Sequence, residues 1–579
     1  MTYTAPVAEQ AFVLDTIADL AGLNRLAAFE AATPDLVLPI LEEAAKLSGN
    51  VFAPLNRKGD TEGAKLADGV VTLPDGFAAA YRQYVEGGWG SLGADPAHGG
   101  QGMPFVLASA VQEQLTSANM AFSLCMMLSQ GAIEALAVHG TPEQQQTYLT
   151  KLVSGEWTGT MNLTEPQAGS DVGALRSKAE RHADGSYRIK GSKIFITWGE
   201  HDVADNIIHL VLARLPDAPP GTRGISLFIV PKFLADGTRN DLRCVSIEHK
   251  LGIHASPTCT MSFGDNDACV GYIVGAENAG MRAMFTMMNH ARINVGLQGV
   301  AIAERAWQGA LAFAKERVQG KRIIEHPDVR RMLMTMKSTT EAIRALTYLN
   351  AAAVDRAHGE TETEAKREWQ ALADLLTPVT KAYATDMGVE LSSLAVQVFG
   401  GMGFIEETGA AQHLRDARIA PIYEGTNGIQ ALDLVNRKLP QGRWKNLFID
   451  IRDTILALPG DGDLGAIASY LDDGVAALEN ATVWMVGNHG DGFDDAAAGA
   501  TPYLRMFGIV AGGWLLAKQA LVAAERLAAA EGDPAFLKAK IVTARFFAEQ
   551  VVPQATALLG PVTRGGSLLF ALEEEQFAA

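Results

Sequence analysis

The sequence predicts an α+β multidomain protein whose parts follow one another as helical, β, helical and helical. A chain of 579 residues exceeds what a single hydrophobic core supports. The spacing of apolar residues changes from three and four to two near residue 158, and back again near residue 280. We therefore expect an N-terminal helical domain (1–158), a small central β-barrel domain (159–278), a helical-bundle domain (279–440) and an extra C-terminal helical domain (445–579).

The first two parts follow from these spacings. The run from Pro104 to His139 places apolar residues at helical intervals, and the 40 residues before it carry GD, DG and PDG turn signals. Runs with a period of two, separated by Gly, Pro, Asp and Asn, then predict strands. These runs are SYRIKGSKIFIT, NIIHLVLARL, RGISLFIVPKF and PTCTMSF.

The remaining parts are predicted to be helical. From Gly280 there is one long stretch without proline, followed by two helices across 328–358 and 362–399, the second of which ends in the glycines of VFGGMGF. LPQGRW, after Lys438, marks a boundary before a last helical block with a Gly/Asp-rich loop at 487–500.

Composition and charge exclude several classes of protein. The net charge of −18 repels phosphate backbones, so we expect no nucleic-acid partner. The four cysteines form no CxxC pair, which favours reduced thiols over a disulfide scaffold or a metal site. The uncharged apolar stretch Met506–Ala517 has 12 residues, too few for a membrane span. Glu9 precedes the first basic residue, Arg25, unlike a leader peptide, and we expect a cytoplasmic protein.

The segment MNLTEPQAGSD (161–171) is a polar turn, expected to lead out of a helix into the first strand. Its exposed N–H groups and the hydroxyls of Thr164 and Ser170 suit a polar ring edge or a phosphate. The same residues also fit a capped turn in solvent.

In the segment KIFITWG (193–199), strand alternation predicts Phe195 and Thr197 on one face and Ile194 and Ile196 on the other. An aromatic ring and a hydroxyl two residues apart suit a flat heteroaromatic cofactor. The core face of a β domain is the alternative.

Three segments of the bundle carry further candidates. Arg317 follows a long helix, where a guanidinium can bind a pyrophosphate or simply face the helix dipole. The glycines of QVFGGMG (397–403) allow backbone N–H groups to approach an anion, or only stop the helix. Glu424 lies between an apolar turn and a helix start capped by Thr426 or Asn427. It is either a buried base or an acid that stabilises the first turn of the helix through the helix dipole.

Together these segments resemble, in order, the signatures of the acyl-CoA dehydrogenase family. The resemblance covers roughly residues 40–440, and the C-terminal block is similar to that of the larger members. It implies FAD as the cofactor, with the adenylate end bound across a subunit interface. The residues that it assigns to the cofactor are Leu163, Thr164, Ser170, Phe195, Thr197, Arg317, Gln397, Gly400, Gly401 and Thr426.

The resemblance also implies the chemistry. In the family the motif YEGT holds the base, so Glu424 is expected to remove the α-proton of a thioester whose oxyanion meets the Glu424 N–H and a ribityl hydroxyl. Some members carry the base at the position of Ala291, and alanine cannot take a proton. The implied substrate contacts are Ser170, Asn289, Arg292, Tyr423 and Gly425.

This sequence departs from the family pattern at four positions. Gln319 replaces the phenylalanine of the family pattern, Gln412 a basic residue, Gly428 a glutamine and Trp198 an asparagine. Segments such as FAPLNRKGD and HPDVRRML are most similar to the subgroup that contains 3-(methylthio)propanoyl-CoA dehydrogenases. The implied activity is FAD-dependent dehydrogenation of an acyl-CoA to the trans-2-enoyl-CoA by a homodimer, with an electron-transfer flavoprotein as acceptor.

Two other functions share this fold. An acyl-CoA oxidase would use the same base with oxygen as acceptor, and would form peroxide. A DNA-binding flavoprotein of the alkylation response would carry a basic C-terminal domain, whereas residues 445–579 contain more acids than bases.

Overall fold

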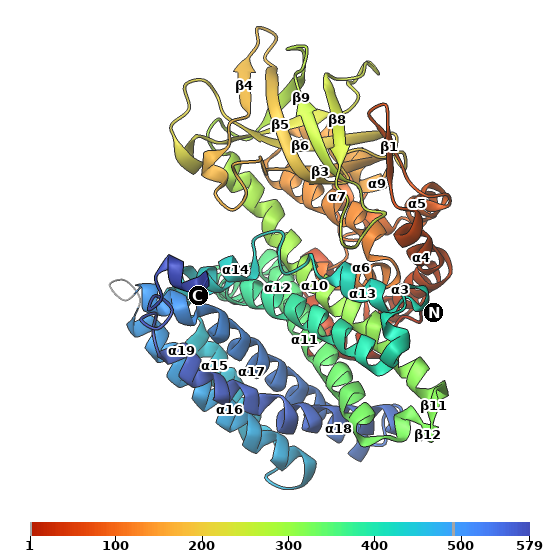
Figure 1. The fold of residues 1–579 in the computed structure, drawn as a ribbon, viewed down its shortest axis with the longest axis vertical. Helices are drawn as coiled ribbons and strands as arrows, with labels where there is room; N and C mark the ends of the chain where they lie inside the picture. Colours follow the sequence, from red (N-terminus) through yellow and green to blue (C-terminus); the bar gives the residue numbers. More distant parts are fainter. Residues whose placement is uncertain (1–2, 489–492, 579) are drawn as a thin grey trace.

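The computed structural model describes residues 3–488 and 493–578, and begins with a helical part (Figure 1). Asn119 both ends α6 and caps α7, because its side chain accepts a hydrogen bond from Phe122 N at 3.1 Å. The segment expected to be loose holds helix α5 and a hairpin whose turn residues, Asp68 and Gly69, both have positive φ. The elements are α1 (Val7–Thr16), α2 (Leu20–Leu23), α3 (Pro34–Leu47), α4 (Ala53–Glu62), β1 (Lys65–Ala67), β2 (Val70–Thr72), α5 (Phe77–Glu86), α6 (Phe105–Ala118), α7 (Met120–His139), α8 (Pro142–Gln144) and α9 (Thr150–Ser154).

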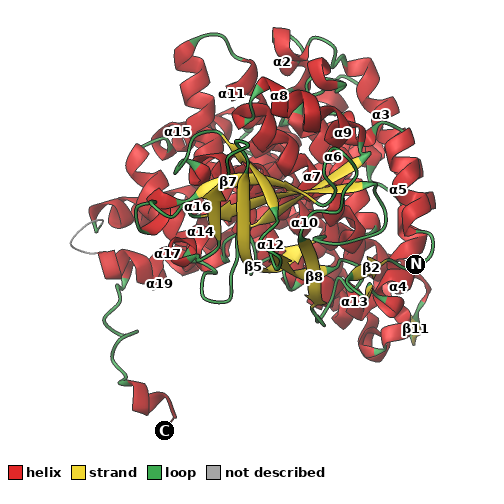
Figure 2. Cartoon of the chain, turned by 90° about the horizontal axis from the view of Figure 1, so that it is seen from above, coloured by secondary structure: helices red, strands yellow, loops and turns green. Residues whose placement is uncertain are grey.

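The central part is an eight-stranded sheet, which Figure 2 shows as one group of strands with helices around it. The path of paired strands is β3-β6-β7-β10-β5-β9-β8, with β4 paired to β5; the β3–β6 pair is parallel and the others are antiparallel. The strands are β3 (Trp157–Asn162), β4 (Lys178–Arg181), β5 (Tyr187–Thr197), β6 (Asn206–Ala213), β7 (Ser226–Pro231), β8 (Leu242–Ile247), β9 (Thr258–Phe263) and β10 (Val270–Val274).

One expectation about this part was wrong. The polar turn that begins near Met161 leaves strand β3 and not a helix, because residues 157–162 pair with β6. This strand was not recognised although its residues, WTGTMN, alternate apolar and polar, because the run has only six residues and includes Gly159.

The helical bundle consists of α10 (Gly280–Glu316), α11 (Pro327–Gly359) and α12 (Thr363–Phe399), within a few residues of the predicted ranges. Helices α10 and α12 pack closely through glycine: a Cβ added at Gly299 would lie 2.1 Å from the carbonyl oxygen of Ala384. Figure 1 shows α10 running from beneath the sheet to the short hairpin of β11 (Val318–Gln319) and β12 (Lys321–Arg322) at the far end.

The C-terminal helices share their hydrophobic core with the bundle. Tyr383 of α12 packs against α17, where a Cβ added at Gly508 would lie 2.3 Å from the ring. Lys540 of α18 donates to Glu9 of α1 and to Glu341 of α11, each at 2.7 Å, and all three side chains are buried or nearly so. The helices are α13 (Ala410–Ala417), α14 (Asn427–Asp433), α15 (Trp444–Ala457), α16 (Gly462–Gly487), α17 (Phe493–Ala528), α18 (Pro534–Gln550) and α19 (Val552–Thr563).

Among the residues that the structure describes, two helices are long and apolar enough to cross a membrane by length and composition alone. They are Met120–His139 and Asp494–Ala528, and 78% and 83% of their most apolar windows are buried inside the protein. The predicted buried helix across Met506–Ala517 is confirmed within α17. The expected loop at 487–500 is shorter than predicted, because residues from Phe493 onward are helical, while 489–492 lie outside the described residues.

Candidate active site

A cavity of about 260 Å³ lies where the sheet meets the start of α10, and we call it the main cavity. The loop after β3, the end of β5, the first turns of α10 and the turn before α14 all contribute to its wall. The lining residues are Leu128, Met161, Leu163, Thr164, Gly169, Ser170, Val172, Phe195, Ile196, Thr197, Met281, Phe285, Met288, Arg292, Glu424, Gly425, Ile429 and Arg437.

A β-bulge aims Phe195 at the main cavity. The pairing of β5 with β9 shifts register between Lys193 and Ile196, and Phe195 has a φ of +59°, a left-handed conformation that is unusual for a bulky residue. The ring is 57% exposed. The predicted alternation was therefore wrong in part, because Phe195 and Thr197 line the cavity together with Ile196 between them.

A buried ion pair fixes the loop after β3. The Lys193 ammonium donates to Glu165 at 2.8 Å and to the carbonyl oxygen of Leu163 at 3.0 Å, while Ile194 N donates to the carbonyl oxygen of Thr164 at 3.0 Å. Burial alone would raise the pKa of Glu165, but Lys193 and the donors of residues 176 and 177 lower it to about 2. Burial lowers the pKa of Lys193 to about 8. The two segments thus form one rigid wall.

The hydroxyl groups on this wall are free to bind a ligand. In the described parts of the chain, the side-chain hydroxyls of Thr164, Ser170 and Thr197 make no hydrogen bond, and all three residues line the main cavity. Together with the exposed ring of Phe195, they offer a stacking surface and donors for the edge of a flat heteroaromatic ring. The donor set fits a flavin.

Glu424 lies on a strained turn at the edge of the main cavity. Its φ is +56° and that of Gly425 is +88°, while Thr426 caps α14 by accepting from Ile429 N at 3.3 Å. Left-handed backbone at a residue with a Cβ costs free energy and is typical of functional sites. Burial raises the pKa of Glu424, and the charges of Arg292 and Lys381 offset part of the rise. The carboxylate is thus suited to accept a proton.

Two cations support this turn from the bundle. Arg292 Nε donates to the carbonyl oxygen of Glu424 at 3.4 Å. The fully buried Lys381 of α12 donates to Asn427 Oδ1 at 2.8 Å, and burial lowers its pKa to about 7. The backbone N–H of Glu424 has no hydrogen-bond partner in the described ranges, so it remains available to a ligand oxygen.

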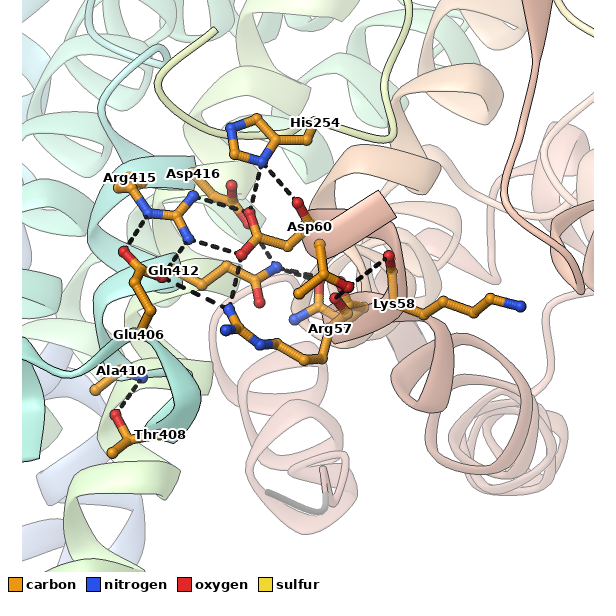
Figure 3. Close-up of polar contacts among 12 residues, drawn as sticks. Arg57, Lys58, Asp60, His254, Glu406, Thr408, Ala410, Gln412, Arg415 and Asp416 are labelled. Atoms are coloured by element: carbon orange, nitrogen blue, oxygen red, sulfur yellow. Dashed lines mark hydrogen bonds and ion pairs between the residues drawn. The ribbon is translucent and has the colours of Figure 1, made fainter. Parts of the chain in front are cut away.

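A three-way junction anchors α13, the helix that precedes this turn (Figure 3). Asp60 of α4 accepts two hydrogen bonds from Arg415 at 2.7 and 2.8 Å and one from Arg57 at 2.8 Å, and His254 of the β part lies 3.0 Å from it. Asp416 accepts from the backbone N–H of Ile253 at 2.5 Å. Three parts of the chain therefore fix the segment that carries Glu424.

The main cavity brings together eight of the residues predicted for the site. Tyr423 lies behind the wall, with its hydroxyl bonded to Gln298; Thr426 acts as a helix cap, and Asn289 is exposed outside the lining. The eight residues in the lining are Leu163, Thr164, Ser170, Phe195, Thr197, Arg292, Glu424 and Gly425.

The structure places the other predicted cofactor residues far away, at the opposite end of the bundle. The rings of Phe313 and Phe399 stack there with centroids 4.4 Å apart, so the ends of α10 and α12 are neighbours. From Arg292 to Arg317 the chain advances 25 residues, or about 38 Å of α-helix, which is beyond the reach of one dinucleotide. The residues at this end are Arg317, Gln397, Gly400 and Gly401, all of them exposed.

Sequence reasoning missed several residues of the site. Met281, Phe285 and Met288 line the main cavity, but the register of the long helix could not be fixed from its sequence. Lys381 did leave a signal, since it is a charge within the otherwise uncharged run LLTPVTKAYAT. A lysine on the buried side of a helix needs a partner or a function.

Comparisons with known proteins agree with this arrangement. Family models match the acyl-CoA dehydrogenase N-terminal domain (53–156), middle domain (160–266) and C-terminal domain (278–439), and an acetyl-CoA dehydrogenase C-terminal-like domain (447–573). The chain is 46% identical to 3-methylmercaptopropionyl-CoA dehydrogenase of Ruegeria pomeroyi, over 99% of this chain and 100% of that protein. It is 37% identical to a butyryl-CoA dehydrogenase of Syntrophomonas wolfei, over 92% of each. The fold is similar to that of a Bacillus anthracis acyl-CoA dehydrogenase complexed with FAD, with a TM-score of 0.75 at 20% identity over 95% of this chain and 91% of that one.

Proposed function

Because the chain belongs to the acyl-CoA dehydrogenase family, we propose that Glu424 is the base that removes the α-proton of an acyl-CoA thioester. The chain is an oxidoreductase that acts on CH–CH bonds with FAD as its cofactor. The observation that carries the proposal is the Glu424 turn, where a carboxylate of raised pKa and an unpaired backbone N–H meet at the main cavity.

The groups of this turn have separate roles in the reaction. The Glu424 N–H donates to the thioester carbonyl oxygen and stabilises the negative charge that develops as the α-proton leaves. The Glu424 carboxylate accepts that proton, and its raised pKa brings its basicity closer to the task. Arg292 holds the carbonyl oxygen of Glu424, so the carboxylate and the N–H keep their relative positions. FAD, when bound, accepts the hydride from the β-carbon.

The wall formed by Leu163, Thr164, Phe195 and Thr197 holds the flavin ring in this proposal, and Ser170 lies between the cofactor and the acyl-CoA. Support comes from the unpaired hydroxyls and from the exposed ring of Phe195. The left-handed conformation of Phe195 costs free energy that ring stacking would offset.

A second copy of the chain completes the cofactor site in this proposal. Arg317, Gln397, Gly400 and Gly401 are too far from the main cavity to reach the same FAD, so they would bind the adenylate end of the partner's cofactor. Exposed apolar side chains lie near them among charged ones, which suits a homodimer interface with an apolar centre. These apolar residues are Val318, Met402, Phe404 and Ile405.

The substrate proposed is 3-(methylthio)propanoyl-CoA, with an electron-transfer flavoprotein as acceptor. Support for the substrate is the 46% identity, over nearly the whole chain, to a protein named for that activity. We also place the enzyme in the cytoplasm, since its four cysteines are free and buried.

The test is anaerobic mixing of the yellow holoenzyme with a panel of acyl-CoA thioesters, followed by the loss of flavin absorbance. We expect 3-(methylthio)propanoyl-CoA and straight-chain thioesters of similar length to bleach the flavin within one turnover. A protein that binds FAD but is bleached by no acyl-CoA would refute the proposed function.

A further inference from the structure

The C-terminal segment 567–578, which we call the arm, lies outside the body of the protein. Every residue of the arm is exposed, and Figure 2 shows it running away from the helices. It is attached only at its start, where Gly566 N donates to Asp495 Oδ1 at 2.6 Å. Among the described residues, no hydrogen bond joins the arm to any residue before Gly566.

The arm is rich in apolar side chains. Five large ones occur within ten residues, and they are between 51% and 81% exposed. A contiguous apolar surface of this kind in a folded protein marks contact with another molecule. The five residues are Leu568, Leu569, Phe570, Leu572 and Phe577.

The charge of the arm narrows the choice of partner. Residues 573–575 are all glutamates, and the arm contains no lysine or arginine. An anionic lipid surface would repel such a segment. The arm therefore fits a protein surface that combines exposed apolar side chains with unpaired cations.

The far end of the bundle has such a surface, which we call the bundle-end surface. Its apolar part is the group of exposed residues proposed above for the homodimer interface, from Val318 to Ile405. Residues 315–331 add six basic and three acidic side chains, in a chain whose net charge is −18. Lys315, Lys321 and Arg330 are exposed and form no ion pair in the described ranges. The bundle-end surface thus complements the arm in both polarity and charge.

The arm of a chain lies on the wrong side to cover its own bundle-end surface. Figures 1 and 2 both place the arm on the side of α14 and α19, and β11 on the opposite side. Helix α14 follows the turn of Glu424, so the arm starts at the main-cavity end of the protein. In the proposed homodimer this end meets the bundle end of the second copy, and an extended segment of this length reaches up to about 40 Å.

We propose that the arm of each copy packs on the bundle-end surface of the other copy. Its apolar side chains cover the apolar part of that surface, and its three glutamates pair with the three unpaired cations. The inference rests on the proposed function, which places a homodimer around the two cofactors. Twofold symmetry makes the two arms equivalent, so each dimer contains two of these contacts.

The first test removes the chain from Ser567 onward in the FAD-loaded enzyme. Each leucine or phenylalanine side chain that is no longer buried costs roughly tenfold in affinity, so the Kd of the dimer should rise at least about a hundredfold. Mass photometry and sedimentation over a dilution series measure that Kd. Flavin fluorescence measures the release of FAD, which should be faster in the shortened enzyme.

The second test exchanges charges between copies. One variant reverses the three glutamates of the arm, and the other reverses the three cations of the bundle-end surface. Each variant alone should form a weak dimer, whereas their mixture should restore the wild-type affinity, because both contacts then join opposite charges. The substitutions are Glu573→Lys, Glu574→Lys and Glu575→Lys in the first variant, and Lys315→Glu, Lys321→Glu and Arg330→Glu in the second.

A matched control reverses charges elsewhere on the surface. Lys65 of β1 and Lys178 of β4 are also exposed and form no ion pair within the described part of the chain. A variant with Lys65→Glu and Lys178→Glu should dimerise like the wild type and should not restore the affinity of the arm variant.

The possible outcomes are distinct. A shortened enzyme with the wild-type dimer Kd, or a mixture of the two charge variants that stays weak, would overturn the role of the arm. An arm that is needed only for flotation with phosphatidylcholine–phosphatidylglycerol vesicles, with an unchanged dimer Kd, would overturn it as well. Absence of flavin bleaching by every acyl-CoA would instead count against the proposed function.

Discussion

Replacement of Lys381 tests how the protein tunes its base. Lys381 is fully buried, donates to Asn427 Oδ1 at 2.8 Å, and its charge lowers the pKa of Glu424 against the effect of burial. The other charged groups around this pair are Arg292 and Asp386, with Asp433 and Arg437 beside Arg292. We expect Lys381→Met to raise the pKa of Glu424, because the carboxylate loses a nearby positive charge.

The size of the pKa shift follows from the fact that Lys381 and Arg292 together lower the pKa of Glu424. One opposite charge close to a carboxylate lowers its pKa by roughly 1–3 units, and Arg292 supplies part of the effect here, so we expect a shift of about one unit. One unit corresponds to about 1.4 kcal/mol. Since only the ionised carboxylate accepts a proton, the acidic limb of kcat/KM moves to higher pH, and activity below that limb falls about tenfold.

The assay is kcat/KM for a short acyl-CoA from pH 5 to 9, with two matched controls. Lys381→Arg keeps the charge and should keep the acidic limb in place. Lys381→Gln keeps a donor for Asn427 without the charge, and should shift the limb as Lys381→Met does. If Lys381→Gln retains the wild-type profile, the lysine acts only through its hydrogen bond and the electrostatic reasoning is wrong.

Two further predictions concern packing and assembly. Lys540→Met leaves the buried carboxylates of Glu9 and Glu341 without their shared cation, so the free energy of unfolding should fall by roughly 3–5 kcal/mol in denaturant titrations; a loss below about 1 kcal/mol would contradict the buried-pair account. Phe404, 86% exposed, lies on the proposed homodimer surface, and Phe404→Glu should produce monomers with reduced FAD content by light scattering and absorbance. A dimer with full flavin content would place the interface elsewhere, and Leu456→Glu, at an equally exposed leucine of α15, is the control.

Much of the fold followed from local patterns. The three long helices of the bundle were predicted within a few residues because each keeps a helical period over more than 30 residues, and proline or glycine marks an end of each. Strand β3 was missed although its six residues alternate apolar and polar, because so short a run that includes Gly159 and directly follows the helical part gives a weak strand signal.

The candidate site was predictable where its residues are close in sequence. The motifs around Thr164 and Glu424 are contiguous, so their composition indicated a function before any contact was known. The bulge at Phe195 depends on pairing with β9 and on the carbonyl oxygen of Thr164, which no alternation pattern encodes. Lys381 contacts the turn of Glu424 from another helix, and sequence spacing does not determine the register between two helices.

The distance between the cofactor residues of the main cavity and those at the far end of the bundle could not be predicted from the sequence either. The resemblance already implied that the adenylate end binds across a subunit interface, and the length of α10 adds that Arg317 and Thr197 of one chain are too far apart to reach the same cofactor. The same geometry supports the proposed homodimer, in which the two groups of residues of one chain would belong to two different cofactor sites.

The central claim is that the carboxylate of Glu424 removes the substrate proton, and rapid mixing of a Glu424→Gln holoenzyme with 3-(methylthio)propanoyl-CoA tests it most directly. The amide keeps the size of the side chain but cannot accept the proton, so flavin bleaching should slow by a factor of roughly 10²–10⁴ while thioester binding persists. Bleaching of that variant at the wild-type rate would show that another group takes the proton.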